Sequence, residues 1–270
     1  MSYENFIAQS WSKHIQTRLE KACVMLEDCN RQFEGDVTHA GRVKILGVAR
    51  PSLTNYTGAS LGTPETVADS SVYLDIDTAK AFNFMVDDVD KAQSTPGLME
   101  ALTEEAGRAL AEARDTYIAA LAVNAGHFSS SLAVSTAAAA KAAIDEAFIT
   151  LWENDVKLSD EVTICLPPWF YSLFKDSMNS LFTDNTEIMR SGVIGLYNAA
   201  KVKLTDNLYN DGTDDYIMVR TKRAIAFAGQ LKKIEAYRPE DLFADALKGL
   251  DVYGGKVVRP DEIYVIKAHQ

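Results

Sequence analysis

The sequence predicts an α+β fold, in which an extended hairpin and a long helix precede a domain of alternating strands and helices. Three observations predict it: period-two alternation over Val72–Val86, helical periodicity from Gly97 to about Asn124, and strand–helix alternation after Ser135. With 270 residues and 47% hydrophobic residues, the chain can bury a core of ordinary size. We find no internal repeat and no low-complexity tract.

The first predicted element is an amphipathic helix over Asn5–Asn30. Apolar residues recur there at near-helical spacing, namely Phe6, Trp11, Ile15, Leu19 and Leu26. Gly35 and Gly41 then interrupt the pattern. This helix is either the first helix of a domain or an arm that lies on a neighbouring chain.

The alternating segment Val72–Val86 is the most informative feature of the sequence. It predicts one strand of about 15 residues, against about 5–6 in a typical strand, and a length of about 45 Å. Its predicted partner is Arg42–Val48, and Ser52–Ser71 between them is polar with little apolar anchoring. A two-stranded ribbon is barely stable alone in water, so this one requires another chain to lie on.

The long helix has Thr95 as its predicted N-cap and Pro96 at its first position. Most charged residues, Arg114 among them, fall off its predicted apolar stripe. That stripe consists of Leu98, Leu102, Ala106, Leu110, Ala113, Tyr117 and Leu121.

The rest of the chain predicts shorter elements. They are helices over Ser135–Glu153 and from Pro167 to about Met178, strands at 161–166, 201–204, 216–219 and 224–227, and apolar stretches at 250–253 and 263–266.

The charge balance restricts the function. A net charge of -11 argues against a protein that grips DNA phosphates, although an acidic subunit can still enclose DNA. The N-terminus lacks the basic region and apolar run of a signal peptide. No stretch approaches the roughly 20 apolar residues of a membrane span. We therefore expect a protein made in a cytoplasm, with no membrane association.

The metal-ligating residue types are scattered. Cys23, Cys29 and Cys165 match no zinc motif, and we interpret them as reduced structural thiols. The four histidines share no metal-ligand spacing. The acidic loop around Gly212 does not match a calcium-binding hand, so we interpret it as a solvated turn, with cation binding by a ring of copies as the alternative. We expect no metal and no cofactor.

One motif suggests an enzyme. Gly58–Gly62 fits G-x-S-x-G, the pattern that holds a nucleophilic serine on a strained turn between a strand and a helix. The flanking residues predict neither element, so we interpret the segment as a loop and assign no catalytic residue. An ester hydrolase that uses Ser60 remains one alternative.

The order of these elements resembles the major capsid proteins of tailed double-stranded-DNA phages, which have the Hong Kong phage-type fold. Three segments carry the resemblance: 82–90 before the long helix, 162–168, and 235–257 with its Lys248–Val257 run. The resemblance implies an N-terminal arm (1–35), an extended β-hairpin loop (36–90), a peripheral domain with a long spine helix (91–134 and 229–270) and an axial domain (135–228).

The resemblance also implies a function. Subunits of this kind form pentamers and hexamers of an icosahedral shell around phage DNA, with the extended loop of one lying over the next. The implied partners are further copies of the chain, a separate scaffolding protein, a portal, and as a further candidate a decoration protein. Candidate inter-subunit contacts are Arg42, Lys44 and Arg50 with Glu65, Asp87, Asp88 and Asp90 of neighbours.

Two rivals are structural rather than enzymatic. An encapsulin-like nanocompartment shell would share the fold and enclose enzymes instead of DNA. A tail or baseplate protein would form tubes or rings.

The extended loop also yields a testable prediction. Some relatives weld their shells with lysine–asparagine cross-links from this loop, but no lysine lies between Ala49 and Ser71. We therefore expect assembled particles, boiled in denaturant, to run as a single band of subunit mass on a gel. A ladder of covalent oligomers would contradict this.

Overall fold

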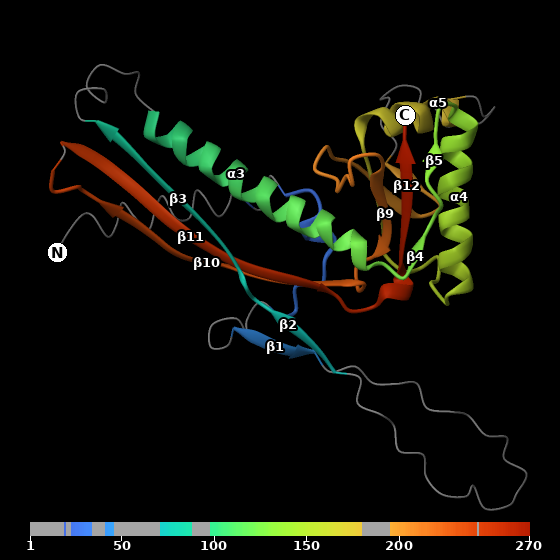
Figure 1. Ribbon diagram of the computed structural model, residues 1–270, viewed down its shortest axis with the longest axis horizontal. Helices are drawn as coiled ribbons and strands as arrows, with labels where there is room; N and C mark the ends of the chain where they lie inside the picture. Colours follow the sequence, from blue (N-terminus) through green and yellow to red (C-terminus); the bar gives the residue numbers. More distant parts are fainter. Residues whose placement is uncertain are drawn as a thin grey trace, which may run out of the picture.

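The computed structural model describes residue 19 and residues 23–33, 41–45, 71–87, 98–179, 195–241 and 243–270. Within them the chain forms an elongated part beside a compact part, with a two-stranded ribbon projecting below (Figure 1). Strands β1 (Arg42–Ile45) and β2 (Val72–Asp75) make the ribbon. In the described residues, no helix is long and apolar enough to cross a membrane.

The elongated part is a three-stranded antiparallel sheet with one long helix on it. Its strands are β10 (Ile225–Tyr237), β11 (Ala244–Val257) and β3 (Thr78–Asp87), in that order. Helix α3 (Leu98–Ala120) continues as the 3-10 helix η3 (Leu121–Asn124) and covers one face of the sheet. The predicted long helix is thereby confirmed to within a residue at its start.

The predicted 15-residue strand is wrong as a single element. It divides at Ile76–Asp77 into β2, which pairs with β1, and β3, which pairs with β11. At this point β11 passes very close to the chain. A Cβ on Gly254 would come within 2.1 Å of the Asp75 carbonyl oxygen. The hairpin prediction holds for Arg42–Ile45, opposite Val72–Asp75.

A buried ion pair ties α3 to the sheet. The Arg114 guanidinium donates to both carboxylate oxygens of Asp251 on β11, at 2.8 and 2.5 Å. The two side chains are 6% and 0% exposed. Arg114 also lies against the rings of Phe227 and Tyr253, each 5.9 Å from its guanidinium carbon. The prediction that Arg114 lies off the buried stripe is wrong, because Asp251 provides a buried partner for it.

The compact part is a seven-stranded mixed sheet of order β4-β12-β9-β6-β8-β7, with β5 also pairing with β12. The strands are β4 (His127–Phe128), β5 (Leu132–Ala133), β6 (Val162–Leu166), β7 (Leu196–Tyr197), β8 (Ala200–Leu204), β9 (Asp215–Thr221) and β12 (Ile263–His269). Strand β12, the last of these along the chain, lies inside the sheet, between β9 on one side and β4 and β5 on the other.

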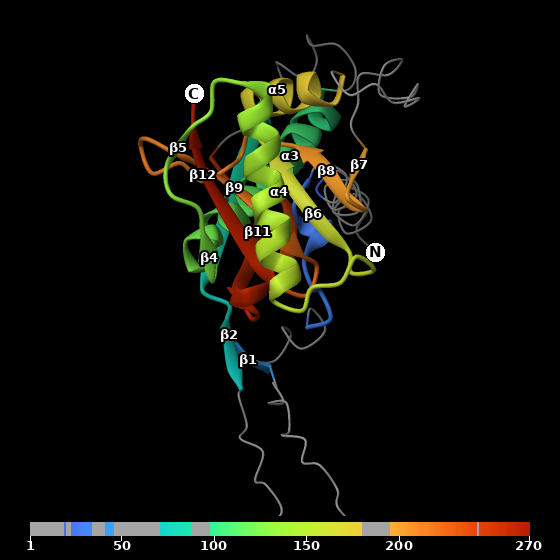
Figure 2. The same ribbon diagram turned by 90° about the vertical axis from the view of Figure 1, so that its right-hand side faces the viewer.

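Helices α4 (Ala137–Glu153) and α5 (Pro168–Asn179) pack on one face of this sheet, as Figure 2 shows for α4. The Thr136 hydroxyl caps α4 by accepting from the Ala139 N–H at 3.3 Å. Both helices and strand β6 follow the sequence prediction to within about two residues.

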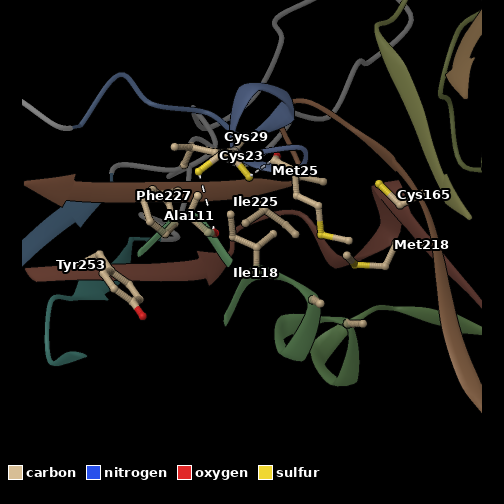
Figure 3. Close-up of a cluster of buried hydrophobic side chains, with 14 of the residues drawn as sticks. Cys23, Met25, Cys29, Ala111, Ile118, Cys165, Met218, Ile225, Phe227 and Tyr253 are labelled. Atoms are coloured by element: carbon tan, nitrogen blue, oxygen red, sulfur yellow. Dashed lines mark hydrogen bonds between the residues drawn. The ribbon is translucent and has the colours of Figure 1, made fainter. Parts of the chain in front are cut away.

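The two parts share a buried core. It combines side chains from α3, from strands of both sheets and from segment 23–29, including Met25, Ile118, Met218 and Ile225 (Figure 3). The N-terminal segment is therefore part of the core and not an appendage to it.

Two further predictions need correction. Strands β10 and β11 run for 13 and 14 residues, where the sequence indicated only short apolar stretches. A register shift between Leu231 and Lys233 disturbs the alternation of β10.

In the predicted helix Asn5–Asn30, Leu26–Asp28 forms a 3-10 turn (η1) and Cys29 is extended, while most of the segment lies outside the described residues.

The Arg114–Asp251 pair makes a prediction about stability. Replacing Arg114 with Met leaves the Asp251 carboxylate buried without its cation, which we expect to cost about 3–5 kcal/mol in urea unfolding of the unassembled subunit. The double variant Arg114→Met/Asp251→Leu removes both charges and should recover most of that loss. A single variant as stable as the parent would contradict the account.

Candidate assembly surfaces

The ribbon base is fixed to the body by apolar packing. Val43 and Ile45 of β1 and Leu74 of β2 are buried against Ala226 and Ala228 of β10. The Ile76 N–H also donates to the Gly41 carbonyl at 3.0 Å. Because the base is anchored in this way, the ribbon leaves the body in a defined direction (Figure 1).

The two positively charged contact candidates that the structure describes, Arg42 and Lys44, both lie on β1 of the ribbon. Arg42 is exposed and pairs with Asp75 across the ribbon, above the ring of Tyr73. The hydrogen bond between them raises the pKa of Arg42 and lowers that of Asp75. Lys44 is exposed on the same strand and has an intrachain interaction of its own.

Of the remaining candidates for contacts between subunits, the structure describes only Asp87. Asp87 ends β3 opposite Ala244. Arg50, Glu65, Asp88 and Asp90 lie outside the described residues, as does Ser60. The contacts that these residues make with neighbouring copies therefore stay a prediction.

The face of the three-stranded sheet opposite α3 carries exposed apolar side chains beyond the part that the ribbon covers, and we call this described region the bare face. Alternation puts Ala79, Ala81 and Met85 of β3 on it, beside Leu250 of β11 and Tyr237 of β10. Met85 is 58% exposed, and Leu250 and Tyr237 are 38% exposed. The solvent side of an antiparallel sheet is ordinarily polar. Exposed apolar side chains gathered on one sheet face in this way mark a candidate interaction surface.

A row of polar contacts crosses the bare face. The Lys248 ammonium lies 2.9 Å from the Glu235 carboxylate and 5.1 Å from the centre of the Tyr237 ring. The Tyr237 hydroxyl donates to Asn83 at 3.1 Å. These contacts hold the side chains of three neighbouring strands in one arrangement.

Three charged side chains hold the N-terminal segment in the seam between the two sheets. We call Asp115 of α3, Lys203 of β8 and Arg220 of β9 the charged clamp. The Asp115 carboxylate accepts from the backbone N–H groups of Val24 (2.7 Å) and Met25 (3.2 Å). Burial raises the pKa of Asp115, and those two hydrogen bonds oppose the shift.

The two cations of the clamp bind the carbonyl side of the same segment. Lys203 donates to the Val24 carbonyl at 2.9 Å, and its ammonium lies 2.6 Å from the Asp28 carboxylate. Arg220 is fully buried and donates to the carbonyls of Met25 (3.0 Å) and Asp28. The segment is thus fixed in the seam mainly through its main chain.

The acidic loop is a solvated turn at its tip, where Asp211 and Gly212 are exposed, but Asp214 and Asp215 are held by partners in the compact part. Asp214 is buried and accepts from Ser131 at 2.9 Å, and it contacts His269 Nδ1 at 2.6 Å. Asp215 accepts from the Trp169 indole at 2.7 Å. Asp211 accepts the backbone N–H groups of residues 213 and 214. These contacts join the loop to β12 and α5 of the compact part.

The cysteines are free and buried. Burial raises the pKa values of Cys23 and Cys165 to about 12, and it raises that of Cys29 as well. Protonated, inaccessible thiols are neither nucleophiles nor metal ligands. No cluster of metal-binding side chains occurs in the part of the chain that the structure describes.

The family model of phage capsid proteins matches residues 69–266. The chain belongs to this family. It is a major capsid protein, a structural component of the virion. A search of curated proteins finds no match to this capsid protein.

Solved structures agree with the family. A structure of Mycobacterium phage Che8 is 29% identical, with a TM-score of 0.77 over 90% of each chain. The capsid of cyanophage P-SCSP1u is 14% identical, with a TM-score of 0.74 over 92% of this chain and 88% of that one. A virus-like particle from Pyrococcus furiosus is 11% identical, with a TM-score of 0.60 over 94% and 96%. The last two similarities show a shared fold.

The clamp of this capsid protein generates a prediction. Asp115→Ala leaves two buried N–H groups without an acceptor, at a cost of about 1–3 kcal/mol each. We expect faster hydrogen exchange and easier proteolysis in residues 23–33 than in the parent. Glu112→Ala, on the exposed side of the same helix, is the matched control and should change neither. Equal protection of the segment in all three proteins would contradict a clamping role.

Proposed function

We propose that copies of this chain form the pentamers and hexamers of an icosahedral shell that encloses phage double-stranded DNA. The observation that carries the proposal is that one subunit has two exposed surfaces of different kinds. The ribbon presents charged and aromatic side chains to solvent on a base that packs on the body, and the bare face presents Met85, Leu250 and Tyr237. Two such surfaces in one subunit are both covered when the ribbon of one copy lies over the bare face of the next.

The organisation that we propose has four parts: an N-terminal arm (1–35), an extended loop (36–90), a peripheral domain (91–134 and 229–270) and an axial domain (135–228). The pairings of β12 with β4, β5 and β9 move residues 127–133 and 263–269 from this peripheral domain to the sheet of the axial domain. Arg42, Lys44 and Arg50 would contact Glu65, Asp87, Asp88 or Asp90 of neighbours. Such exposed pairs are weak singly, so a shell gains stability from their number.

The proposal extends to the partners and the life cycle. The subunit would fold in the host cytoplasm and assemble with a separate scaffolding protein and a portal, and a decoration protein is a further candidate. The acidic net charge of -11 fits a shell that encloses DNA without binding its sequence. The chain would act as a structural subunit and not as an enzyme. The family match favours a phage capsid over an encapsulin-like shell, a tail protein or a hydrolase.

Deleting Thr54–Thr66 tests the role of the loop. The ribbon base, β1 and β2, stays in the chain, so we expect a soluble, folded subunit that no longer assembles. Circular dichroism would report the fold, and sedimentation with electron microscopy would report the assembly.

A variant in which glycine and serine replace the same segment at equal length separates loop length from loop contacts. It should also fail to assemble. Shells of normal form from either variant would refute the role of the loop.

A further inference from the structure

Exposed apolar side chains gather at one edge of the axial sheet. Ile149 and Trp152 on α4 are 53% and 43% exposed, and Leu196 on β7 is 66% exposed. The ring of Phe148 connects the two elements, since its centroid lies 5.6 Å from that of Trp152 and 6.1 Å from that of Tyr197. Because Tyr197 faces α4, Leu196 points to the other face of the same edge, beside Lys201. We call Ile149, Trp152 and Leu196 the edge patch.

The edge patch is rigid. The Tyr197 hydroxyl donates to Asp145 of α4 at 2.5 Å, which ties β7 to the helix. The opposite side of α4 is packed into the core through Ala140, Ile144 and Leu151. A surface tryptophan on a rigid apolar patch has the composition of an interaction hot spot.

The opposite edge of the same sheet carries a second, different surface. Strands β4 and β5 lie there, and Figure 2 shows β5 and β7 on opposite sides of the sheet. Phe128 on β4 is 39% exposed and packs edge-on against Tyr216. The Lys267 ammonium lies 5.0 Å from the centre of the Phe128 ring and 5.2 Å from that of Tyr216.

The two edges also differ in charge. Lys201 is exposed and lies opposite Leu196 in the β7–β8 register, beside the edge patch. Asp211 is exposed at the other edge, where its carboxylate accepts from the Tyr216 hydroxyl at 3.2 Å. Hydrogen bonds from the backbone N–H groups of residues 214 and 213 lower the pKa of Asp211, so it is anionic at neutral pH.

We propose that the edge patch of one copy docks on the β4–β5 edge of the next copy around a ring. A closed ring built from one kind of subunit needs two different, complementary surfaces on opposite flanks. The axial sheet has an apolar patch beside a lysine on one flank and an exposed aromatic ring beside an aspartate on the other. The inference rests on the proposed function and specifies which surfaces of the axial domain would meet.

Cysteine cross-linking in assembled particles tests this pairing. The native thiols are buried, so they give a low background. We expect the double variant Phe128→Cys/Leu196→Cys to give, after mild oxidation, a reducible ladder that ends at about five or six subunits. The pair Leu196→Cys/Phe243→Cys, whose second site is an exposed residue between β10 and β11, is the control and should give no ladder.

Other outcomes overturn the proposal. Dimers from Leu196→Cys alone would show that two edge patches meet each other in a symmetric contact. A normal shell without any ladder from the Phe128→Cys/Leu196→Cys pair would show that the ring forms through other surfaces. A parent protein that never forms shells would instead refute the proposed function, so the two failures are distinguishable.

A substitution provides a second readout. Ile149→Lys puts a charge into the edge patch at an exposed position, and we expect it to reduce the yield of shells at least tenfold while the subunit stays folded. Val123→Lys, at a position that is 50% exposed on η3, is the matched control and should assemble like the parent. Equal yields from both variants would overturn the role of the patch.

Discussion

The charged clamp in the seam is the interaction on which the rest of the subunit depends. The two large sheets share no strand, and the segment Cys23–Asn30 lies between them. Asp115 from α3 and Lys203 and Arg220 from the seven-stranded sheet all bind that segment through its main chain. The Asn30 N–H donates to Ile225, and the Phe227 N–H donates back to Asn30, which extends the connection onto β10. Releasing the segment would therefore loosen the spine helix, both sheets and the entry of the N-terminal arm together.

Much of the fold followed from periodicity, because helices and strands with one buried side leave a repeating pattern. The spine helix, α4, β6 and α5 were predicted within about two residues. The buried charges were not, because Arg114, Asp115 and Arg220 are acceptable inside only with partners that lie far away in the sequence. The partner change between β2 and β3 was also missed, since it depends on the close approach of Gly254. The bare face of the three-stranded sheet was not predicted either, because it depends on the pairing of β10, β11 and β3, which no local sequence pattern specifies.

The surfaces left exposed by this fold have a common explanation. The bare sheet face and the edge patch each expose apolar side chains to water, and the ribbon projects charged ones, yet each of the three has a packed base. A monomer would keep them exposed at a cost in solubility. A shell buries them between copies, and closed symmetry covers strand edges that otherwise invite uncontrolled pairing. The same features that make the single subunit appear incomplete thus suit it to assembly.

Electron microscopy of the purified protein, produced alone and with its candidate scaffolding protein, tests the central claim most directly. The account predicts closed polyhedral shells in at least one of the two preparations. Tubes or irregular sheets from the protein alone, converted to closed shells by the scaffold, would agree with it. A uniform small monomer or dimer in both preparations would contradict it.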